Sequence, residues 1–460
     1  MTIHRKATNV RARGPLSVVC LAAVTALLAA PVATSAPIGI DAQVVDAGFE
    51  SYRASFPVVE YGGRGGARRG TTRWRVVEQT GNCCENYLTS AKDGRLFDFG
   101  GTYLNFSDDR GATWKSVRPL EPLVNGEGAV VMAPGGDVVG VQWDPYSGDH
   151  LLTFKYEAAE ERWLYNEMPL HQPFYDREWV GVVPGPVTFG SITAPYVSFI
   201  KGAYPSKEAW YLSFDGLNYA QVSSKEAERL LGESFDGYPQ IKATPDFDWI
   251  QPNTNMGLAA LGAGRAIASP DWPFEGGDWS IFDGETRRWS GFTFAEGVRP
   301  QGRMQVDSGG RLNNLIPGGH RFVYRISSDG GRTWRSTTVR LPKGTAIEEV
   351  DFRANKQVGI AAVAVHAHDS DTNKDVDLLY KLDIRRARPV LTRFYRVGRG
   401  DINSAAGLGA AIRFDFETVT ILPDGRIAMS FQDSTGLAAS RVTGQEQIWP
   451  SLAIEGRTSF

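Results

Sequence analysis

One eight-residue motif occurs twice in this chain. Residues 107–114 read SDDRGATW and residues 327–334 read SSDGGRTW, so both copies fit the pattern Ser-x-Asp-x-Gly-x-x-Trp. Each copy follows a segment in which apolar and polar residues alternate, as they do in a β-strand. The residue types suit a hairpin turn, because Asp accepts hydrogen bonds from turn amides, Gly takes a positive φ and Trp folds back as an apolar plug. The sequence therefore predicts the repetition of a small β unit.

This pattern is that of the Asp box, also called the bacterial neuraminidase repeat. With two full copies, the chain resembles sialidases and the wider class of secreted Asp-box β-propellers. The resemblance implies a propeller of four-stranded blades for most of the chain, and a sialidase-like activity on an extracellular glycan. The motif indicates an architecture, however, and does not by itself indicate a reaction.

Tight-turn signals between apolar segments recur along the chain after about residue 62. Several of them lie about 42 to 49 residues apart, which is the length of one four-stranded propeller blade. The strands between them are short and rich in Val, Tyr, Phe and Trp, with almost no helical periodicity, so we predict an all-β fold. Degenerate copies of the motif around Asp215 and Asp283 keep a similar spacing. The turn signals lie at residues 92–95, 134–137, 184–186, 263–265, 308–311, 355–356 and 423–426.

We predict one propeller domain over residues 62–460, preceded by an N-terminal extension at 36–61. Counting from turn to turn favours seven blades, and six, the number that the sialidase resemblance implies, is the alternative. Two wide intervals between turns are expected to hold long loops or an irregular blade, with one short helix at 224–232. A β-sandwich with two fortuitous motif copies is the alternative fold.

The first 35 residues have the pattern of a secretory signal peptide. A basic start is followed by an apolar stretch at 16–30 and then by small residues. Because Pro37 disfavours cleavage directly before it, we expect the cut near Ala33 or Ser35 and an extracellular mature protein; an uncleaved anchor is the alternative. No later segment approaches the ~20 apolar residues of a membrane helix, so no membrane span is expected after cleavage.

Loss of the signal segment makes the chain more acidic. The segment carries four basic and no acidic residues, so the formal net charge changes from −3 to about −7. Nucleic acid is then not an expected partner, because phosphate binding needs a basic footprint. An anionic glycan can still bind to a local arginine cluster. We therefore predict an extracellular glycan as the partner and a monomeric chain.

Three cysteines are present, and Cys20 leaves with the signal peptide. The other two, Cys83 and Cys84, are adjacent in the sequence, which rules out a disulfide between distant segments of one chain. In an oxidising compartment they form a strained vicinal disulfide, remain two thiols or bond to another chain. We predict the vicinal disulfide and place it beside Glu85 at the rim of the propeller channel.

Charged residues recur at the predicted start of the first strand of each blade. In a propeller these first strands line the channel, and one end of them forms the usual ligand face. Charged side chains rarely begin a buried strand unless they are paired, hydrated or functional. The shared position suggests a ring around the axis, and solvated loop ends are the alternative. The residues at this position are Glu85, Glu127, Asp176, Arg177, Glu178, Asn255, Arg303, Glu348, Glu349, Asp415 and Glu417.

The segment 175–179, YDREW, has the densest set of charges. Arg177 can hold a substrate carboxylate or sugar hydroxyls, while Asp176 can take or give a proton. Because side chains alternate along a strand, both carboxylates and Arg177 meet one ligand only if the strand starts irregularly. An internal salt bridge between blades is the alternative. A second strand has the same character, with one face formed by Arg413, Asp415 and Glu417.

The sialidase resemblance implies an arginine triad, a Tyr nucleophile paired with Glu, an Asp acid/base and an early Phe/Tyr-Arg-Ile-Pro motif. The early motif is absent, and the similar string at 324–327, YRIS, lacks the Pro and runs into a motif copy. By position in the repeat, Arg177, Arg303 and Arg413 can supply the triad. The predicted catalytic residues are Asp176, Glu127 and Glu417. The predicted substrate-binding residues are Arg177, Arg303, Arg413, Tyr175, Glu178, Glu85, Glu349 and Asp415.

No cofactor is predicted, because the chain has no nucleophile elbow, phosphate loop or dinucleotide fingerprint. The acidic ring could hold a structural Ca²⁺, which takes six to eight oxygen ligands. His366 and His368 share one face of a strand, but no third and fourth ligand cluster with them in the sequence, so no metal site is predicted there.

The sequence leads to two hypotheses about function. The first is a secreted sialidase-like glycoside hydrolase that uses the carboxylates and arginines of the channel rim. The alternative is a non-catalytic propeller that binds glycan or protein through rim aromatics such as Trp179 and Trp249. A carboxylate pair facing a pocket would favour the enzyme, whereas acids neutralised by arginines would favour the binding protein.

Overall fold

The computed structural model describes the following residues: 43–46, 51–62, 66–78, 87–99, 104–118, 128–143, 150–169, 176–189, 192–203, 209–222, 248, 258–262, 265–268, 280–283, 288–291, 303–329, 331–372, 374–402, 418–433 and 449–459. In these ranges the fold is all-β, as the sequence predicts, and its one short helix is the 3₁₀ turn η1 (Pro134–Gly136). Among the described residues, no helix has the length and apolar character needed to cross a membrane.

Most strands belong to four-stranded antiparallel sheets in which consecutive strands pair. The first holds β4 (Tyr87–Ser90), β5 (Leu96–Phe99), β6 (Leu104–Ser107) and β7 (Lys115–Arg118), with β1 (Gln43–Asp46) added beside β7. The second holds β8 (Gly128–Met132), β9 (Val138–Trp143), β10 (His150–Glu157) and β11 (Arg162–Pro169). The third holds β12 (Asp176–Phe189), β13 (Ile192–Ala203), β14 (Ala209–Ser213) and β15 (Ala220–Val222).

The later sheets continue the same pattern. One holds β16 (Leu258–Gly262), β17 (Arg265–Ala268), β18 (Ser280–Asp283) and β19 (Arg288–Gly291), and the next holds β20 (Arg303–Val306), β21 (Leu312–Gly318), β22 (Arg321–Ser327) and β23 (Arg335–Arg340). The last is a nine-stranded sheet. It joins β24 (Thr345–Asn355), β25 (Ile360–Asp369), β26 (Lys374–Asp383) and β27 (Val390–Ile402) to β2 (Ser51–Glu60), β3 (Arg68–Glu78), β30 (Trp449–Ser459), β29 (Ile427–Asp433) and β28 (Val419–Ile421).

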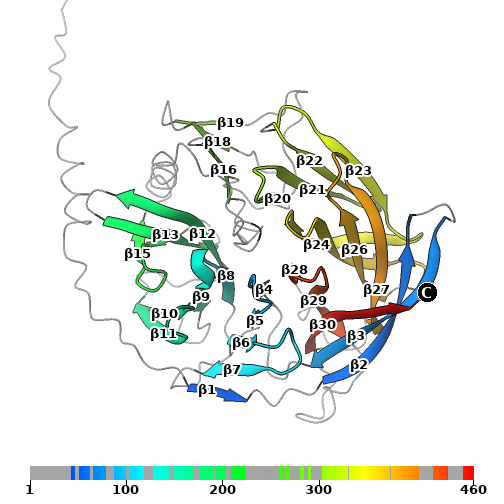
Figure 1. Ribbon diagram of the computed structural model, residues 1–460, viewed down its shortest axis with the longest axis horizontal. Coiled ribbons are helices and arrows are strands. Elements are labelled where there is room, and N and C mark those ends of the chain that lie inside the picture. The colour runs from blue at the N-terminus through cyan, green and yellow to red at the C-terminus, as the bar shows by residue number, and fades with distance from the viewer. Residues whose placement is uncertain are drawn as a thin grey trace, which may run out of the picture. The chain divides into compact units, whose positions relative to one another are not determined.

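Each smaller sheet has one edge strand, and the nine-stranded sheet has two, that lie next to the corresponding strand of a neighbouring sheet. We call these the inner strands: β4, β8, β12, β16, β20, β24 and β28. Contacts run from β4 to β8 to β12, then from β16 to β20 to β24 to β28, and from β28 back to β4. Figure 1 shows these strands turned toward a common centre, with the later strands of each sheet farther out. Meanders that follow one another in this way form a β-propeller arrangement.

The two ends of the described chain meet in one sheet. Strand β3 pairs antiparallel with β30 (Figure 1). The C-terminal strands β28, β29 and β30 are therefore followed in the sheet by a strand from the N-terminal part of the chain. Strand β2 then pairs with both β3 and β27. Residues 43–46 and 51–60 therefore supply strands to the sheets, although the sequence assigned residues 36–61 to an extension outside the propeller.

Where the structure describes them, the predicted tight turns connect inner strands to second strands, with one exception. Residues 92–95, 134–137 and 308–311, for example, join β4 to β5, β8 to β9 and β20 to β21. The prediction of a turn at 184–186 is wrong, because β12 runs through these residues and pairs with β13 on both sides of them. Pro184 and Pro186 lack the amide hydrogen needed for a regular ladder, and the strand shifts register there instead of reversing.

The repeated motif forms a hydrogen-bonded turn between the third and fourth strands, which we call the Ser–Asp turn. In the first copy, Asp109 Oδ1 accepts hydrogen bonds from the amides of Ala112 and Thr113, both at 2.8 Å. The Ser107 hydroxyl donates to the same Oδ1 at 2.8 Å and accepts from the Gly111 amide at 2.7 Å. Side-chain hydrogen bonds to turn amides therefore close the Ser–Asp turn, in place of the backbone hydrogen bonds of an ordinary hairpin turn.

Two further copies of the Ser–Asp turn keep this geometry. In the copy at 327–334, the Thr333 amide donates to Asp329 Oδ1 at 2.9 Å. The degenerate copy around Asp215 has no Thr at the equivalent position, but Asn218 donates to Asp215 from both its amide and its side chain, each at 2.7 Å. The turn thus depends on the Ser–Asp pair and a donor three or four residues later, so a degenerate sequence can form it.

The two motif tryptophans differ in burial. Trp114 is 5% exposed and packs in a cluster that joins the sheet of β4–β7 to that of β28–β30, with Leu422, Leu452 and Ile454 among its members. Trp334 is half-buried, donates its indole N–H to the Gly331 carbonyl at 2.9 Å and lies under the Arg325 guanidinium. The first motif therefore contributes a buried Trp to the packing between sheets, whereas the half-buried Trp334 closes its own hairpin and packs against the edge of a core cluster.

Several predictions concern residues outside the described ranges. These are the signal peptide at 1–35, the short helix at 224–232 and the vicinal disulfide between Cys83 and Cys84. They stay predictions.

Candidate functional site

Six of the predicted rim residues lie near the N-terminal ends of inner strands. They are Asp176, Arg177 and Glu178 in β12, Arg303 in β20, and Glu348 and Glu349 in β24. For Asp176, Arg177 and Glu178 the structure describes the backbone. The roles proposed for them stay predictions, as do those of residues outside the described ranges: Glu85, Glu127, Tyr175, Arg413, Asp415 and Glu417, together with Trp249.

Two inner strands are irregular at this end. In β12 the register with β13 shifts between Asp176 and Glu178, so that Arg177 is the extra residue. In β24 the register with β25 shifts between Ile347 and Glu349, so that Glu348 is the extra residue. A β-bulge bends its strand and re-aims a side chain. Residues 176–178 are expected to meet one ligand only if their strand starts irregularly. The backbone of β12 has this irregular start.

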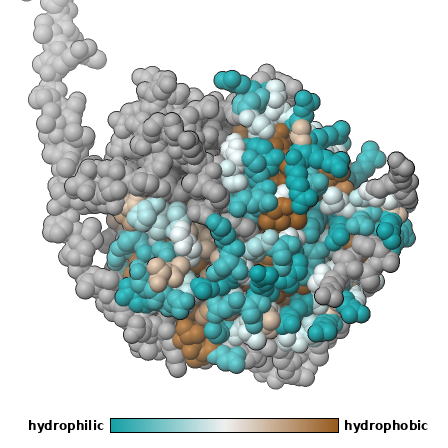
Figure 2. Space-filling model, in the orientation of Figure 1, coloured by the Kyte–Doolittle hydropathy of each residue, from teal (hydrophilic) through white to brown (hydrophobic). Residues whose placement is uncertain are grey.

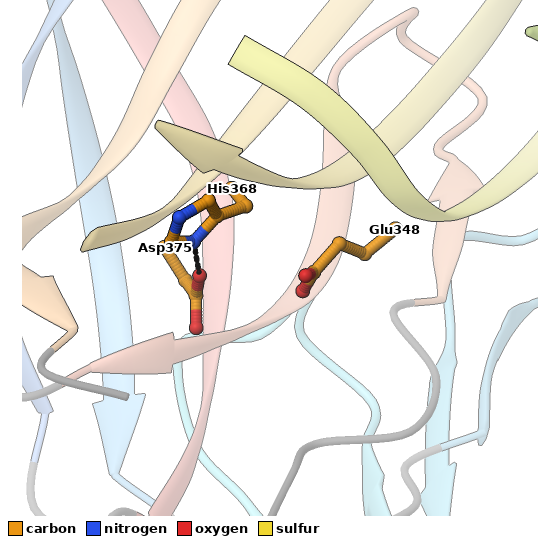
Figure 3. Close-up of side chains that lie close together, drawn as sticks. All are labelled: Glu348, His368 and Asp375. Carbon is orange, nitrogen blue, oxygen red and sulfur yellow. Dashed lines mark hydrogen bonds and ion pairs between the residues drawn. The ribbon is translucent and has the colours of Figure 1, made fainter. Parts of the chain in front are cut away.

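The bulge in β24 brings Glu348 close to a histidine and an aspartate from the next two strands. His368, near the end of β25, lies 2.8 Å from Asp375, near the start of β26, measured from Nδ1 to Oδ1. One side-chain ligand atom from each of Glu348, His368 and Asp375 lies within 4.8 Å of the other two. Figure 3 shows the Glu348 carboxylate extending toward the His368–Asp375 pair. We call these residues, with His366 and Asp377, the β24–β26 cluster.

A second histidine–aspartate pair lies one step along the same face. His366 Nδ1 is 2.9 Å from Asp377 Oδ1, and His366 Nε2 is 3.7 Å from Glu348 Oε2. The two pairs arise from strand register, because His366 lies opposite Asp377 and His368 lies opposite Asp375. Alternation along both strands then puts all four side chains on one face.

Burial differs across the cluster. Asp377 and His366 are 2% and 6% exposed, Asp375 is 9% exposed, and Glu348 is exposed. Buried carboxylates are costly unless they are paired or bind a cation. The inner part of the cluster, formed by Asp377 and His366, is therefore buried, and its outer part, formed by Glu348 and His368, is in contact with solvent.

A buried ion network continues the same face of β24 toward the middle of the strand. Asp351 Oδ1 pairs with Arg353 at 2.9 Å and with Arg303 of β20 at 3.3 Å. Its other oxygen accepts a hydrogen bond from the Val419 amide of β28 at 3.1 Å. Burial lowers the pKa of the Arg303 guanidinium, and the charges of Asp351 and Glu349 oppose that effect. Asp351 therefore links three neighbouring inner strands.

The network bears on the role predicted for Arg303. Its side chain is buried and its guanidinium lies against an internal carboxylate. A substrate carboxylate would have to share that guanidinium with Asp351, which makes a structural role the more direct explanation of this geometry. The substrate-binding role of Arg303 stays a prediction, and so does that of Glu349, which is half-buried beside Glu348.

The sequence pointed to His366 and His368 but not to their partners. Asp375, Asp377 and Asp351 carry no motif of their own, and their positions opposite the histidines depend on the hairpin register. A signal was nevertheless present: the string HAH at 366–368 is followed by DVD at 375–377. Two alternating pairs separated by one turn would face each other in a hairpin of matching register.

The described surface is mostly hydrophilic in the view of Figure 2, with small hydrophobic areas between polar ones. Large exposed hydrophobic side chains among the described residues are Val44, Tyr61 and Val390, which lie on separate strands or strand ends.

Comparisons with known proteins give weak similarities. No protein-family model matches the chain, and a search of curated proteins finds no match. Among solved structures, the lectin AAL of Aleuria aurantia in complex with Fucα1-6GlcNAc has a TM-score of 0.38 and 11% identity, over 72% of this chain and 99% of the lectin. The polysaccharide lyase Uly1 has a TM-score of 0.37 and 9% identity, over 78% and 89% of the two chains.

A gluconolactonase from Xanthomonas campestris has a TM-score of 0.31 and 10% identity, over 71% of this chain and 95% of the enzyme. Similarities at this level assign the chain to no family and carry no argument about its function.

Proposed function

We propose that this chain is a secreted seven-bladed propeller of the Asp-box type that acts on an extracellular glycan as a glycoside hydrolase. The observation that carries the proposal is the β24–β26 cluster, where carboxylates and imidazoles gather at the N-terminal end of an inner strand. Such mixed groups are the usual means of proton transfer. The blade count is supported by the seven inner strands, two of which, β24 and β28, belong to the nine-stranded sheet where the two chain ends meet.

Within this proposal the exposed Glu348 is the group that first meets a sugar. A ligand atom of its carboxylate lies within 4.8 Å of one of Asp375. The two groups are therefore at least as close as the carboxyl pair of retaining glycosidases, which lies about 5–5.5 Å apart. The residues predicted from the sequence, Asp176 and Arg177 above all, belong to the same rim and would bind the rest of the glycan.

A second candidate function is glycan binding without catalysis. It is favoured by the ion network, in which Arg303 and Arg353 neutralise Asp351. A rim whose acids are neutralised retains hydrogen-bonding capacity but loses the free carboxylate that hydrolysis needs. The β24–β26 cluster differs in this respect, because its carboxylates face histidines.

The two functions are separated by testing hydrolysis and binding on the same glycans. The purified mature chain is incubated with a panel of sialylated and neutral glycans, and released sugars are quantified; glycan binding is measured in parallel. Hydrolysis that falls at least tenfold in Glu348→Gln or Asp176→Asn, with the circular-dichroism spectrum unchanged, supports the enzyme. Binding without released sugar supports the second function. If the chain neither hydrolyses nor binds any glycan of the panel, both functions are contradicted.

A further inference from the structure

The β24–β26 cluster has the composition of a metal site. It offers two carboxylates and a histidine whose ligand atoms lie within 4.8 Å of one another, from three adjacent strands. Strands hold their side chains more rigidly than loops, and the bulge at Glu348 adds a side chain that a regular strand would not supply. The donor set is therefore fixed on three sides by the sheet.

His366 provides an independent geometric argument. Its Nδ1 lies 2.9 Å from the buried Asp377, a contact that in the neutral ring places the hydrogen on Nδ1 and directs the Nε2 lone pair outward. That Nε2 is 3.7 Å from Glu348 Oε2. Two ligands of a tetrahedral ion lie roughly 3.4 Å apart when each bond is about 2.1 Å long. A lone pair and a carboxylate at this separation match two ligands of one ion.

The second histidine lies against a carboxylate of the donor set itself. His368 Nδ1 is 2.8 Å from Asp375 Oδ1, so an imidazole nitrogen and a carboxylate oxygen lie side by side as two ligand atoms. Charge points the same way. Three carboxylates, two of them buried, surround two imidazoles, so a divalent cation would compensate negative charge that is otherwise costly to bury.

We infer that the β24–β26 cluster binds one divalent transition-metal ion of the zinc class. Glu348, His368 and Asp375, whose ligand atoms lie together, are its ligands. His366, held by Asp377, has its Nε2 3.7 Å from Glu348 and is placed to join them. Imidazole nitrogen favours such ions over Ca²⁺, which prefers a shell of six to eight oxygens. This inference does not rest on the proposed function. It competes with the carboxyl-pair arrangement at Glu348 and Asp375, because carboxylates that coordinate an ion are not available as acid and nucleophile.

Metal binding is tested directly on the purified mature chain. After treatment with EDTA and removal of the chelator, the protein is titrated with Zn²⁺, and bound metal is measured by mass spectrometry and calorimetry. We expect one ion per chain, with a higher melting temperature in Zn²⁺ than in EDTA. Ca²⁺ at the same concentration is expected to give neither effect.

Substitutions locate the ion. Glu348→Gln, His368→Gln and Asp375→Asn should each weaken Zn²⁺ binding by more than about tenfold, and His366→Gln by about 10- to 100-fold. The matched control is Asp371→Asn, an exposed carboxylate in the turn between β25 and β26, which should bind Zn²⁺ like the parent. Because Glu348 is exposed, its variant should fold even if a buried substitution does not.

Cysteines need a control of their own, since adjacent thiols can bind zinc. A chain with Cys83→Ser and Cys84→Ser should keep its bound ion. Loss of the ion from this double variant, or equal binding by the parent and Glu348→Gln, would overturn the inference. So would the absence of stoichiometric Zn²⁺ from the parent. None of these outcomes depends on glycan hydrolysis, so failure here leaves the proposed function separately testable.

Discussion

Trp114→Ala should destabilise the fold far more than Trp334→Ala, although both residues close the same sequence motif. Trp114 is 5% exposed and packs between two sheets, whereas Trp334 is half-buried. Removal of a buried Trp side chain takes away about 200 Å² of contact, which at about 25 cal/mol per Å² is about 5 kcal/mol. Measured substitutions of buried Phe or Trp by Ala cost about 3–5 kcal/mol, which agrees.

Trp334 contributes through smaller interactions. Its indole donates one hydrogen bond, worth about 0.5–1.5 kcal/mol, and a cation–π contact with Arg325 adds about 0.5–1 kcal/mol near the surface. With partial loss of apolar burial, we expect a total near 2 kcal/mol for Trp334→Ala.

Chemical denaturation followed by circular dichroism measures both costs on one scale. The midpoint should shift about twice as far for Trp114→Ala as for Trp334→Ala, at an unchanged slope. Equal shifts, or a cost below about 1 kcal/mol for Trp114→Ala, would refute the argument that this side chain joins neighbouring sheets.

Two further predictions concern the turns. Gly111→Ala should destabilise the chain by more than Gly135→Ala, because both glycines have a positive φ near +85° but a Cβ at Gly111 would collide with Ile454, whereas the space beside Gly135 is open; thermal unfolding of the two variants gives the comparison, and equal losses would show that the collision relaxes. Acid should weaken the Ser–Asp turns: burial raises the pKa of Asp215, but hydrogen bonds from Asn218, Leu217 and Ser213 outweigh it, so the pKa is lowered on folding. A carboxylate with a lowered pKa stabilises the fold above its unfolded value of about 3.9 and loses that contribution as pH falls through the folded value. The melting temperature of the parent should therefore fall more steeply below about pH 4 than that of Asp215→Ala, which should already be destabilised by about 1–3 kcal/mol at pH 7; parallel curves would contradict the role of this carboxylate.

Local chemistry alone was enough to predict much of the fold. The Ser–Asp turns, the turns between inner and second strands and the all-β class depend on contacts within a few residues, so the residues themselves specify them. The same reasoning failed at 184–186, where two prolines and a glycine mark a turn locally but the neighbouring strand β13 keeps the segment extended. Pairing between strands outweighed local preference there.

Only the tertiary structure decided what lies beside what. The sequence places charged residues at the start of inner strands but cannot specify that a bulge turns Glu348 toward His368, or that Asp375 lies opposite it, because both depend on the register of paired strands. It likewise gave no sign that β3 pairs with β30, which lies near the other end of the chain. Nor did it indicate that Asp351 forms ion pairs with Arg303 and Arg353 and accepts a hydrogen bond from β28. Register and closure are set by long-range packing, since shifting a strand by one residue exchanges its two faces.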